Sequence, residues 1–109
     1  MAVTVIWHNP RCSKSRETLA LIEGYAPQIR LYLQDPPSLE DLRDAAERLG
    51  SARALLRAKE DGAPAPDADD AVILAALVAN PKLIERPLVL HKTRAAIGRP
   101  PQAVLDLFS

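Results

Sequence analysis

The sequence predicts one α/β domain, residues 1–109, with a four-stranded mixed sheet, helices packed on it, and a three-helix insertion, residues 35–85, between strands two and three. Three observations lead to this prediction. The chain opens with a strand–helix–strand pattern, closes with two β-rich runs and a helical one, and carries only helical patterns between them. With 109 residues, 48% of them hydrophobic, the chain can bury a substantial core.

The first unit begins with Val3–Trp7, an apolar, β-rich run that suits a strand buried on both faces. A helix is predicted over Arg16–Glu23, with Gly24 as its C-terminal cap. A second strand is predicted over Ile29–Leu33. Strand, helix and strand in this order form a right-handed crossover, so the two strands are expected to be parallel.

The insertion begins after two consecutive prolines, at a capping pattern. Ser38 is predicted to cap a helix that ends at Gly50, with Asp41 three residues on as the capping-box partner. The residues expected on its inner face are Leu39, Leu42, Ala46 and Leu49.

The rest of the insertion alternates helical patterns with a loop. A short helix is predicted from Ser51 through Arg57, and Glu60–Pro66 is a loop because it holds one glycine and two prolines. Asp67 is expected to cap a helix over Ala68–Ala79, which Asn80-Pro81 ends.

The chain closes with a strand, a strand and a helix. Leu88–Leu90 and Thr93–Ile97 are predicted to pair antiparallel across a tight turn at His91-Lys92. The last helix starts within Gly98–Pro101, where proline suits the first turn. Its expected inward-facing residues are Val104, Leu105 and Phe108.

Cys12, the only cysteine, lies between the first strand and the first helix. The unpaired N–H groups and the positive dipole end of a helix favour a thiolate, which is the nucleophilic form of cysteine. His8, Lys14 and Arg16 surround it in the sequence. A lone cysteine is often only a small buried apolar residue. The basic neighbours at a strand-to-helix junction favour a reactive thiol instead.

Composition narrows the class of protein. Lysine plus arginine equal aspartate plus glutamate at 14 each, which disfavours a broad nucleic-acid-binding surface. The longest apolar runs are too short to span a membrane, and the start lacks a basic targeting segment, so we expect a cytoplasmic protein. One cysteine and two histidines make a poor metal site. No self-association surface is evident, so we expect a monomer.

The chain resembles the glutaredoxin-linked arsenate reductase (ArsC-type) family, which has a thioredoxin-like fold and is related to Spx-type regulators. Four sequence pieces carry the resemblance, and they occur in the same order along nearly the whole chain. The pieces are His8-Asn9-Pro10 with Cys12, Ser15 and Arg16; Arg53-Ala54-Leu55-Leu56-Arg57; Ile84-Glu85-Arg86-Pro87; and Gly98-Arg99-Pro100.

The resemblance implies a role for each matching residue. Cys12 would attack arsenate, His8 would help to set the charge of the thiol, and Arg57, Arg86 and Arg99 would bind the oxyanion. Arginine suits this role because its planar fork gives two parallel hydrogen bonds. Pro87 would follow a cis peptide bond. No cofactor is expected to be bound; glutathione would be a co-substrate and glutaredoxin a partner.

Two other functions stay open. The chain also resembles Spx-type regulators that bind RNA polymerase, although these usually carry a second cysteine where this chain has Ser15. A glutathione-dependent thiol oxidoreductase without arsenate activity would fit the Cys12–Ser15 pattern, which looks like a monothiol site. A low-molecular-weight phosphatase is excluded, because it needs an arginine six residues after the cysteine and Thr18 occupies that position.

Overall fold

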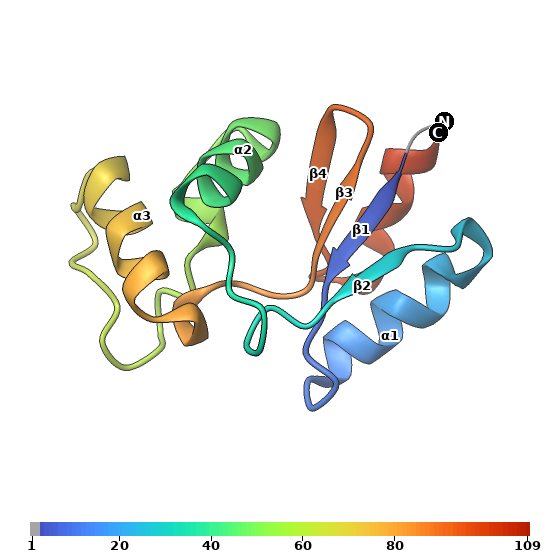
Figure 1. Cartoon of the computed structure of the whole chain (residues 1–109), viewed down its shortest axis with the longest axis horizontal. Coiled ribbons are helices and arrows are strands. Elements are labelled where there is room, and N and C mark those ends of the chain that lie inside the picture. Colours follow the sequence, from blue (N-terminus) through green and yellow to red (C-terminus); the bar gives the residue numbers. More distant parts are fainter. Residues whose placement is uncertain (1–2) are drawn as a thin grey trace.

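The computed structural model describes residues 3–109 and confirms the predicted fold class (Figure 1). The sheet has the strand order β2-β1-β3-β4. Its strands are β1 (Thr4–Trp7), β2 (Gln28–Arg30), β3 (Leu88–His91) and β4 (Arg94–Ile97). β1 pairs with β2 in parallel, and the β1–β3 and β3–β4 pairs are antiparallel. The predicted parallel first pair and mixed sheet are therefore correct.

Helix α1 (Ser13–Ile22) begins three residues before the predicted start at Arg16, so that Cys12 is its N-cap residue. It leads into a single 3₁₀ turn, η1 (Glu23–Tyr25). The prediction of Gly24 as the C-terminal cap was wrong, because the left-handed residue that ends this region is Ala26, with φ of 50°.

β2 is shorter than the predicted strand over 29–33, because the chain turns back directly after Arg30. The carbonyl oxygen of Leu31 accepts hydrogen bonds from the amides of Gln34 and Asp35, at 2.9 and 2.8 Å. This turn carries Tyr32 into the core, where its side chain is fully buried. β2 is also an edge strand, which has only one neighbour to hold it.

Helix α2 (Leu39–Leu49) has the predicted capping box between Ser38 and Asp41 and ends at Gly50, with φ of 81°. Its inner face differs in part from the prediction. Leu39 is 38% exposed, whereas Leu42 and Ala45 are fully buried. Leu39 is the first helical residue and is not part of the buried cluster that Leu42 and Ala45 join.

The remainder of the insertion consists of η2 (Arg53–Leu55), α3 (Asp70–Ala79) and η3 (Pro81–Leu83). The short helix ends before Arg57 because Leu56 forms an antiparallel bridge with Ile84. The cap of α3 is two residues later than predicted. Asp69, not Asp67, accepts the hydrogen bond from the Val72 amide at 3.0 Å.

The C-terminal hairpin turns at Lys92-Thr93, one residue later than predicted, because His91 pairs with Arg94. Lys92 takes the left-handed conformation, with φ of 56°. The last helix, η4 (Pro101–Phe108), is a 3₁₀ helix. Three residues per turn place Pro101, Val104 and Leu107 inward, whereas Leu105, predicted inward, is 38% exposed. Phe108 is only half-buried and stacks on Tyr25.

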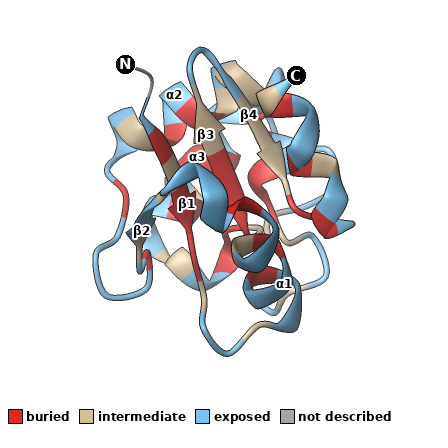
Figure 2. Ribbon diagram, turned by 90° about the vertical axis from the view of Figure 1, so that its right-hand side faces the viewer, coloured by how far each residue is buried: buried red, intermediate tan, exposed pale blue. Residues whose placement is uncertain are grey.

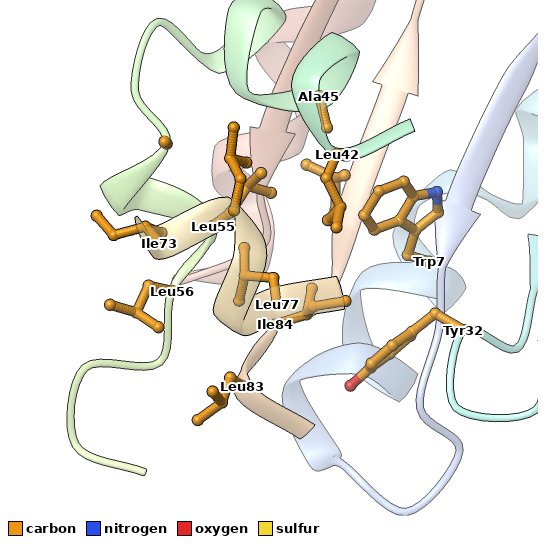
Figure 3. Packing of buried hydrophobic residues seen from close by; sticks show 13 residues of the cluster. Trp7, Tyr32, Leu42, Ala45, Leu55, Leu56, Ile73, Leu77, Leu83 and Ile84 are labelled. Carbon is orange, nitrogen blue, oxygen red and sulfur yellow. The ribbon is translucent and has the colours of Figure 1, made fainter. Parts of the chain in front are cut away.

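The two faces of the sheet are covered by different parts of the chain (Figures 1 and 2). Trp7 and Leu88 face the insertion and pack with Leu42, Leu55, Ile73, Leu77 and their neighbours (Figure 3). Ile6 and Val89 face the other way and pack with Ile22 of α1 and Val104 and Leu107 of η4. β1 is therefore buried on both faces, as predicted, and its carboxyl end leads directly to Cys12.

Gly98 links β4 to η4 at a point without room for a side chain. A Cβ atom there would overlap Thr18 Oγ1 of α1 and would lie 2.7 Å from Pro87 Cγ. We expect Gly98→Ala to lower the free energy of unfolding by about 1–3 kcal/mol, the usual cost of overpacking. Urea denaturation would measure it, with Gly24→Ala as the control, because no atom lies within 4 Å of a Cβ there. Equal stability of the two variants would contradict the close packing.

Candidate active site

Cys12 is partly exposed and stands at the N-terminus of α1, in an extended conformation. Local hydrogen bonds hold the loop before it. The Cys12 amide donates to the Asn9 carbonyl at 3.0 Å, and the Asn9 side chain accepts from the Arg11 amide at 3.0 Å. The Arg16 guanidinium donates to the Pro10 carbonyl at 2.8 Å. The thiol is thus presented at a fixed position where the helix dipole favours negative charge.

The surroundings of Cys12 stabilise its thiolate. Burial raises the pKa of the thiol, but the amides of Ser15 and Lys14 and the Arg86 guanidinium outweigh it, so that the pKa lies below its ordinary value. Arg99 Nη2 also donates a hydrogen bond to the sulfur, at 3.7 Å. Two arginines from outside α1, Arg86 and Arg99, therefore lie beside the thiol, and positive charge of this kind lowers the pKa of a cysteine.

The backbone brings the three predicted arginines toward one another. The Arg57 amide donates to the Leu83 carbonyl at 2.8 Å, so the end of the short helix lies against the segment before Arg86. The Gly98 amide donates to the Pro87 carbonyl at 2.9 Å, which places Arg99 beside the same segment. The Arg99 side chain then donates to the Arg86 carbonyl at 2.9 Å. The peptide bond between Arg86 and Pro87 is cis.

Two of these arginines, Arg57 and Arg99, form ion pairs with carboxylates. Glu85 Oε1 lies 3.0 Å from Arg99 Nε and 3.9 Å from Arg57 Nε, and Glu60 Oε2 lies 3.6 Å from Arg57 Nη1. Sequence reasoning did not select Glu85, although it directly precedes Arg86 in one of the matching sequence pieces. A carboxylate directly beside an arginine in the sequence is a candidate for positioning it, and this signal was present.

His8 is buried, and Ser15 connects it to the start of α1. His8 Nδ1 lies 2.7 Å from Ser15 Oγ, which also accepts the Asn9 amide at 3.0 Å. Burial, and next the positive charge of Arg16, lower the pKa of His8, so the neutral imidazole is favoured. Its hydrogen bond goes to Ser15, which in turn belongs to the helix turn that faces the thiol.

A cavity of about 460 Å³ opens beside two of the three predicted arginines, whereas Cys12 and Arg99 are not part of its lining. Arg57 and Arg86 line it, together with His8, Tyr32 and Glu60. Within residues 3–109, no cluster of His, Cys, Asp and Glu side chains is placed to hold a metal ion. In the same range each helix is too short or too polar to cross a membrane.

Arg30 lies outside the predicted site, and its side chain is tied to the fold. Its side chain is 23% exposed and lies 3.2 Å from Asp41 Oδ2, and its Nη2 donates to the Pro36 carbonyl at 3.1 Å. It also lies over the Trp7 ring, 5.7 Å from the centroid. Arg30 therefore fixes the connection between β2 and α2. Arg43, Arg48, Arg53 and Arg94 lie at the surface or near it.

The lowered pKa of Cys12 gives a measurable expectation. A depressed pKa means that thiolate persists to lower pH in the native protein than in the unfolded chain. Thiolate absorbance at 240 nm, titrated against pH with and without denaturant, should therefore show the lower midpoint in the native state. Arg86→Gln should raise the native midpoint only, because it removes the guanidinium beside the sulfur. Coinciding native and unfolded midpoints would contradict thiolate stabilisation.

Comparisons with known proteins agree on one family. The model of the ArsC family matches residues 7–107. An arsenate reductase of Neisseria meningitidis serogroup A is 45% identical over 87% of this chain and 89% of its own. The uncharacterized protein YfgD of Escherichia coli K12 is 46% identical over 94% and 93%. A solved structure, an arsenate reductase from Vibrio cholerae, is 43% identical over 96% and 97%, with a TM-score of 0.88.

Proposed function

Because this chain belongs to the ArsC family and has its thioredoxin-like fold, we propose that it is an arsenate reductase in which Cys12 is the nucleophile. The observation that supports this most is the surroundings of Cys12, where a helix N-terminus and two arginines favour the thiolate next to a cavity lined by cationic side chains. Relatives that are named arsenate reductase support an oxidoreductase activity.

The first step is displacement at arsenic. Arsenate binds with its oxygens toward Arg57, Arg86 and Arg99, whose forks match a tetrahedral oxyanion. The Cys12 thiolate attacks arsenic, a sulfur–arsenic bond forms, and an arsenic–oxygen bond breaks. The departing hydroxide takes a proton and leaves as water. The arginines stabilise the charge that this step concentrates on the remaining oxygens.

The second stage needs electrons from outside the chain. Reduction of arsenate to arsenite takes two electrons, and Cys12 is the only cysteine among 109 residues. Two external thiols therefore supply these electrons and end as one disulfide, and Cys12 returns to its thiolate. We assign these thiols to glutathione and glutaredoxin, with glutathione as a co-substrate. We further propose that the protein works as a monomer in the cytoplasm, where a thiol such as Cys12 stays reduced.

His8 and Ser15 are proposed to position the turn that faces the thiolate. A neutral His8 bonded to Ser15 fixes the hydroxyl, and the Ser15 amide then points at the sulfur. Pro87 follows Arg86 directly and is not in the lining of the cavity. Neither His8 nor Pro87 needs to touch arsenic.

A coupled assay tests the proposal. NADPH oxidation is followed with glutathione, glutaredoxin and glutathione reductase present, with and without arsenate. Arsenate-dependent oxidation is expected. No arsenate-dependent rate, together with turnover of a glutathione-mixed disulfide, would replace the proposal with a thiol oxidoreductase. Silence in both assays, with capture of purified RNA polymerase, would favour a regulator instead.

A further inference from the structure

Glu85 is the side chain that connects the three arginines of the candidate site. Its Oε1 atom lies 3.0 Å from Arg99 Nε and 3.9 Å from Arg57 Nε. The same oxygen accepts a hydrogen bond from the Arg86 amide at 3.2 Å. Within residues 3–109, Glu85 is the only carboxylate that forms ion pairs with more than one of these arginines. One carboxylate oxygen therefore lies within 4 Å of all three residues.

The backbone holds Glu85 between the segments that carry Arg57 and Arg99. The Glu85 amide donates to the carbonyl of Leu55, two residues before Arg57, at 2.6 Å. On the other side, Arg99 Nε also donates to the Arg86 carbonyl at 2.9 Å. The Glu85 side chain is 22% exposed, so water and salt screen its ion pairs only in part. The fold therefore fixes Glu85 where it can set the positions of the guanidinium groups.

A carboxylate beside an anion site has two opposite effects on the anion. Its negative charge repels the anion and weakens binding. Its hydrogen bonds hold flexible arginine side chains in one arrangement, so that less conformational freedom is lost when the anion binds. Glu85 contacts Arg99 at Nε, and Arg99 Nη2 donates to the Cys12 sulfur at 3.7 Å. This division of the guanidinium between the carboxylate and the thiol favours the second effect.

We propose that Glu85 is a positioning residue, which holds the Arg57 and Arg99 guanidinium groups in place for the oxyanion and keeps Arg99 beside Cys12. This inference rests on the proposed function, and it needs no contact between Glu85 and arsenic. The gain from a fixed arrangement of arginines exceeds the repulsion between the carboxylate and the anion. Repulsion alone and positioning therefore predict opposite results when Glu85 is replaced by a neutral residue.

Binding of inorganic phosphate tests the proposal without turnover. Phosphate should slow alkylation of Cys12 by iodoacetamide, and the concentration that gives half protection should rise about tenfold in Glu85→Ala, because misplaced guanidinium groups bind the anion poorly. Glu85→Gln keeps the shape and one acceptor oxygen, so its increase should be smaller, about threefold. An unchanged or lower protecting concentration in either variant would overturn the proposal.

The Cys12 thiol gives a second measurement with opposite expected signs. If Glu85 keeps Arg99 beside the sulfur, Glu85→Gln should raise the pKa of Cys12, because the hydrogen bond from Arg99 is weakened. Loss of a negative charge alone would lower that pKa. Arg86, which also faces the sulfur, is unchanged in this variant. The midpoint of thiolate absorbance against pH should therefore rise, and an unchanged or lower midpoint would contradict the role of Glu85.

Asp44→Asn is the matched control. Asp44 pairs with Arg48 within α2 at 3.1 Å and is not part of the cavity lining. It should leave phosphate protection unchanged within about twofold. A change as large as that in Glu85→Gln would overturn the assignment, because any lost surface charge would then act alike.

Urea denaturation of each variant checks the fold, and Glu85→Gln decides the question if Glu85→Ala does not fold. Phosphate protection without arsenate turnover would count only against the proposed reaction, and the effect of Glu85 would still be measured by protection. No protection of the unsubstituted protein by phosphate or arsenate would overturn both proposals.

Discussion

Replacement of Cys12 by serine is expected to reduce arsenate-dependent NADPH oxidation by a factor on the order of 10³ or more, because a serine hydroxyl is a much weaker nucleophile than a thiol whose pKa is lowered by its surroundings. The structure offers no second thiol to take over the attack, since Cys12 is the only cysteine in the sequence. Steady-state rates at saturating glutathione and glutaredoxin would measure the loss.

The same variant should fold as well as the unsubstituted protein. The Cys12 side chain is partly exposed, and Arg99 Nη2 donates a hydrogen bond to its sulfur at 3.7 Å. We expect the free energy of unfolding to change by no more than about 0.5 kcal/mol. Ser13→Ala, at an exposed residue one position along the same helix, is the control and should keep full activity. Retained turnover in Cys12→Ser would place the nucleophile elsewhere.

The sequence predicted the parts of the fold that depend on local patterns. The Ser38–Asp41 capping box and the left-handed Gly50 are decided by chemistry within a few residues, and both are present in the structure. Elements fixed by distant contacts were placed less well. β2 ends early because its turn carries Tyr32 into a core made largely by the insertion, and no local signal marks that contact.

The number of residues per turn in the last helix, η4, is another feature that local sequence patterns did not predict. Prolines at its start and the apolar residues after it predicted a helix in the right place. They did not distinguish a 3₁₀ helix from an α-helix, which decides whether Leu105 or Leu107 is buried. The inward face follows the contacts with α1 and β4, which a local pattern does not contain.

For the candidate site, the sequence indicated which residues could do chemistry, but it did not indicate which side chains contact one another. A cysteine before a helix and arginines in separate matching pieces could be selected from the sequence. Glu85 was missed because its importance depends on neighbours 28 and 14 residues away in the sequence, Arg57 and Arg99. Only the folded chain shows which charges meet.

These partnerships suggest why the arginines should act as one unit. The Glu85 carboxylate lies between Arg57 and Arg99, and the Arg99 side chain is bonded to the Arg86 carbonyl. Arg57 and Arg99 therefore share one carboxylate, so a change at either guanidinium alters the electrostatic environment of the other. A ligand that binds all three would be affected by any single replacement, and a second replacement would find part of the interaction already lost.

Replacement of Arg57, Arg86 or Arg99 by lysine should lower kcat/KM for arsenate tenfold or more, on the order of 1.4 kcal/mol, because lysine keeps the charge but loses the planar fork. Alanine should cost more at each position. Arg57→Ala combined with Arg86→Ala should cost less than the sum of the two single losses, because the residues share one ligand. Steady-state kinetics, with circular dichroism to check the fold of each variant, would measure these effects.

Arg43→Ala is the matched control for this series, because Arg43 is exposed on α2, away from the cavity lined by Arg57 and Arg86. It should leave kcat/KM unchanged within a factor of about two, roughly 0.4 kcal/mol. If the arginines only stabilise the surface, Arg57→Ala will behave like Arg43→Ala. If instead the losses are large but strictly additive, the arginines act on separate steps. Only large and non-additive losses fit a single oxyanion held by three guanidinium groups beside the Cys12 thiolate.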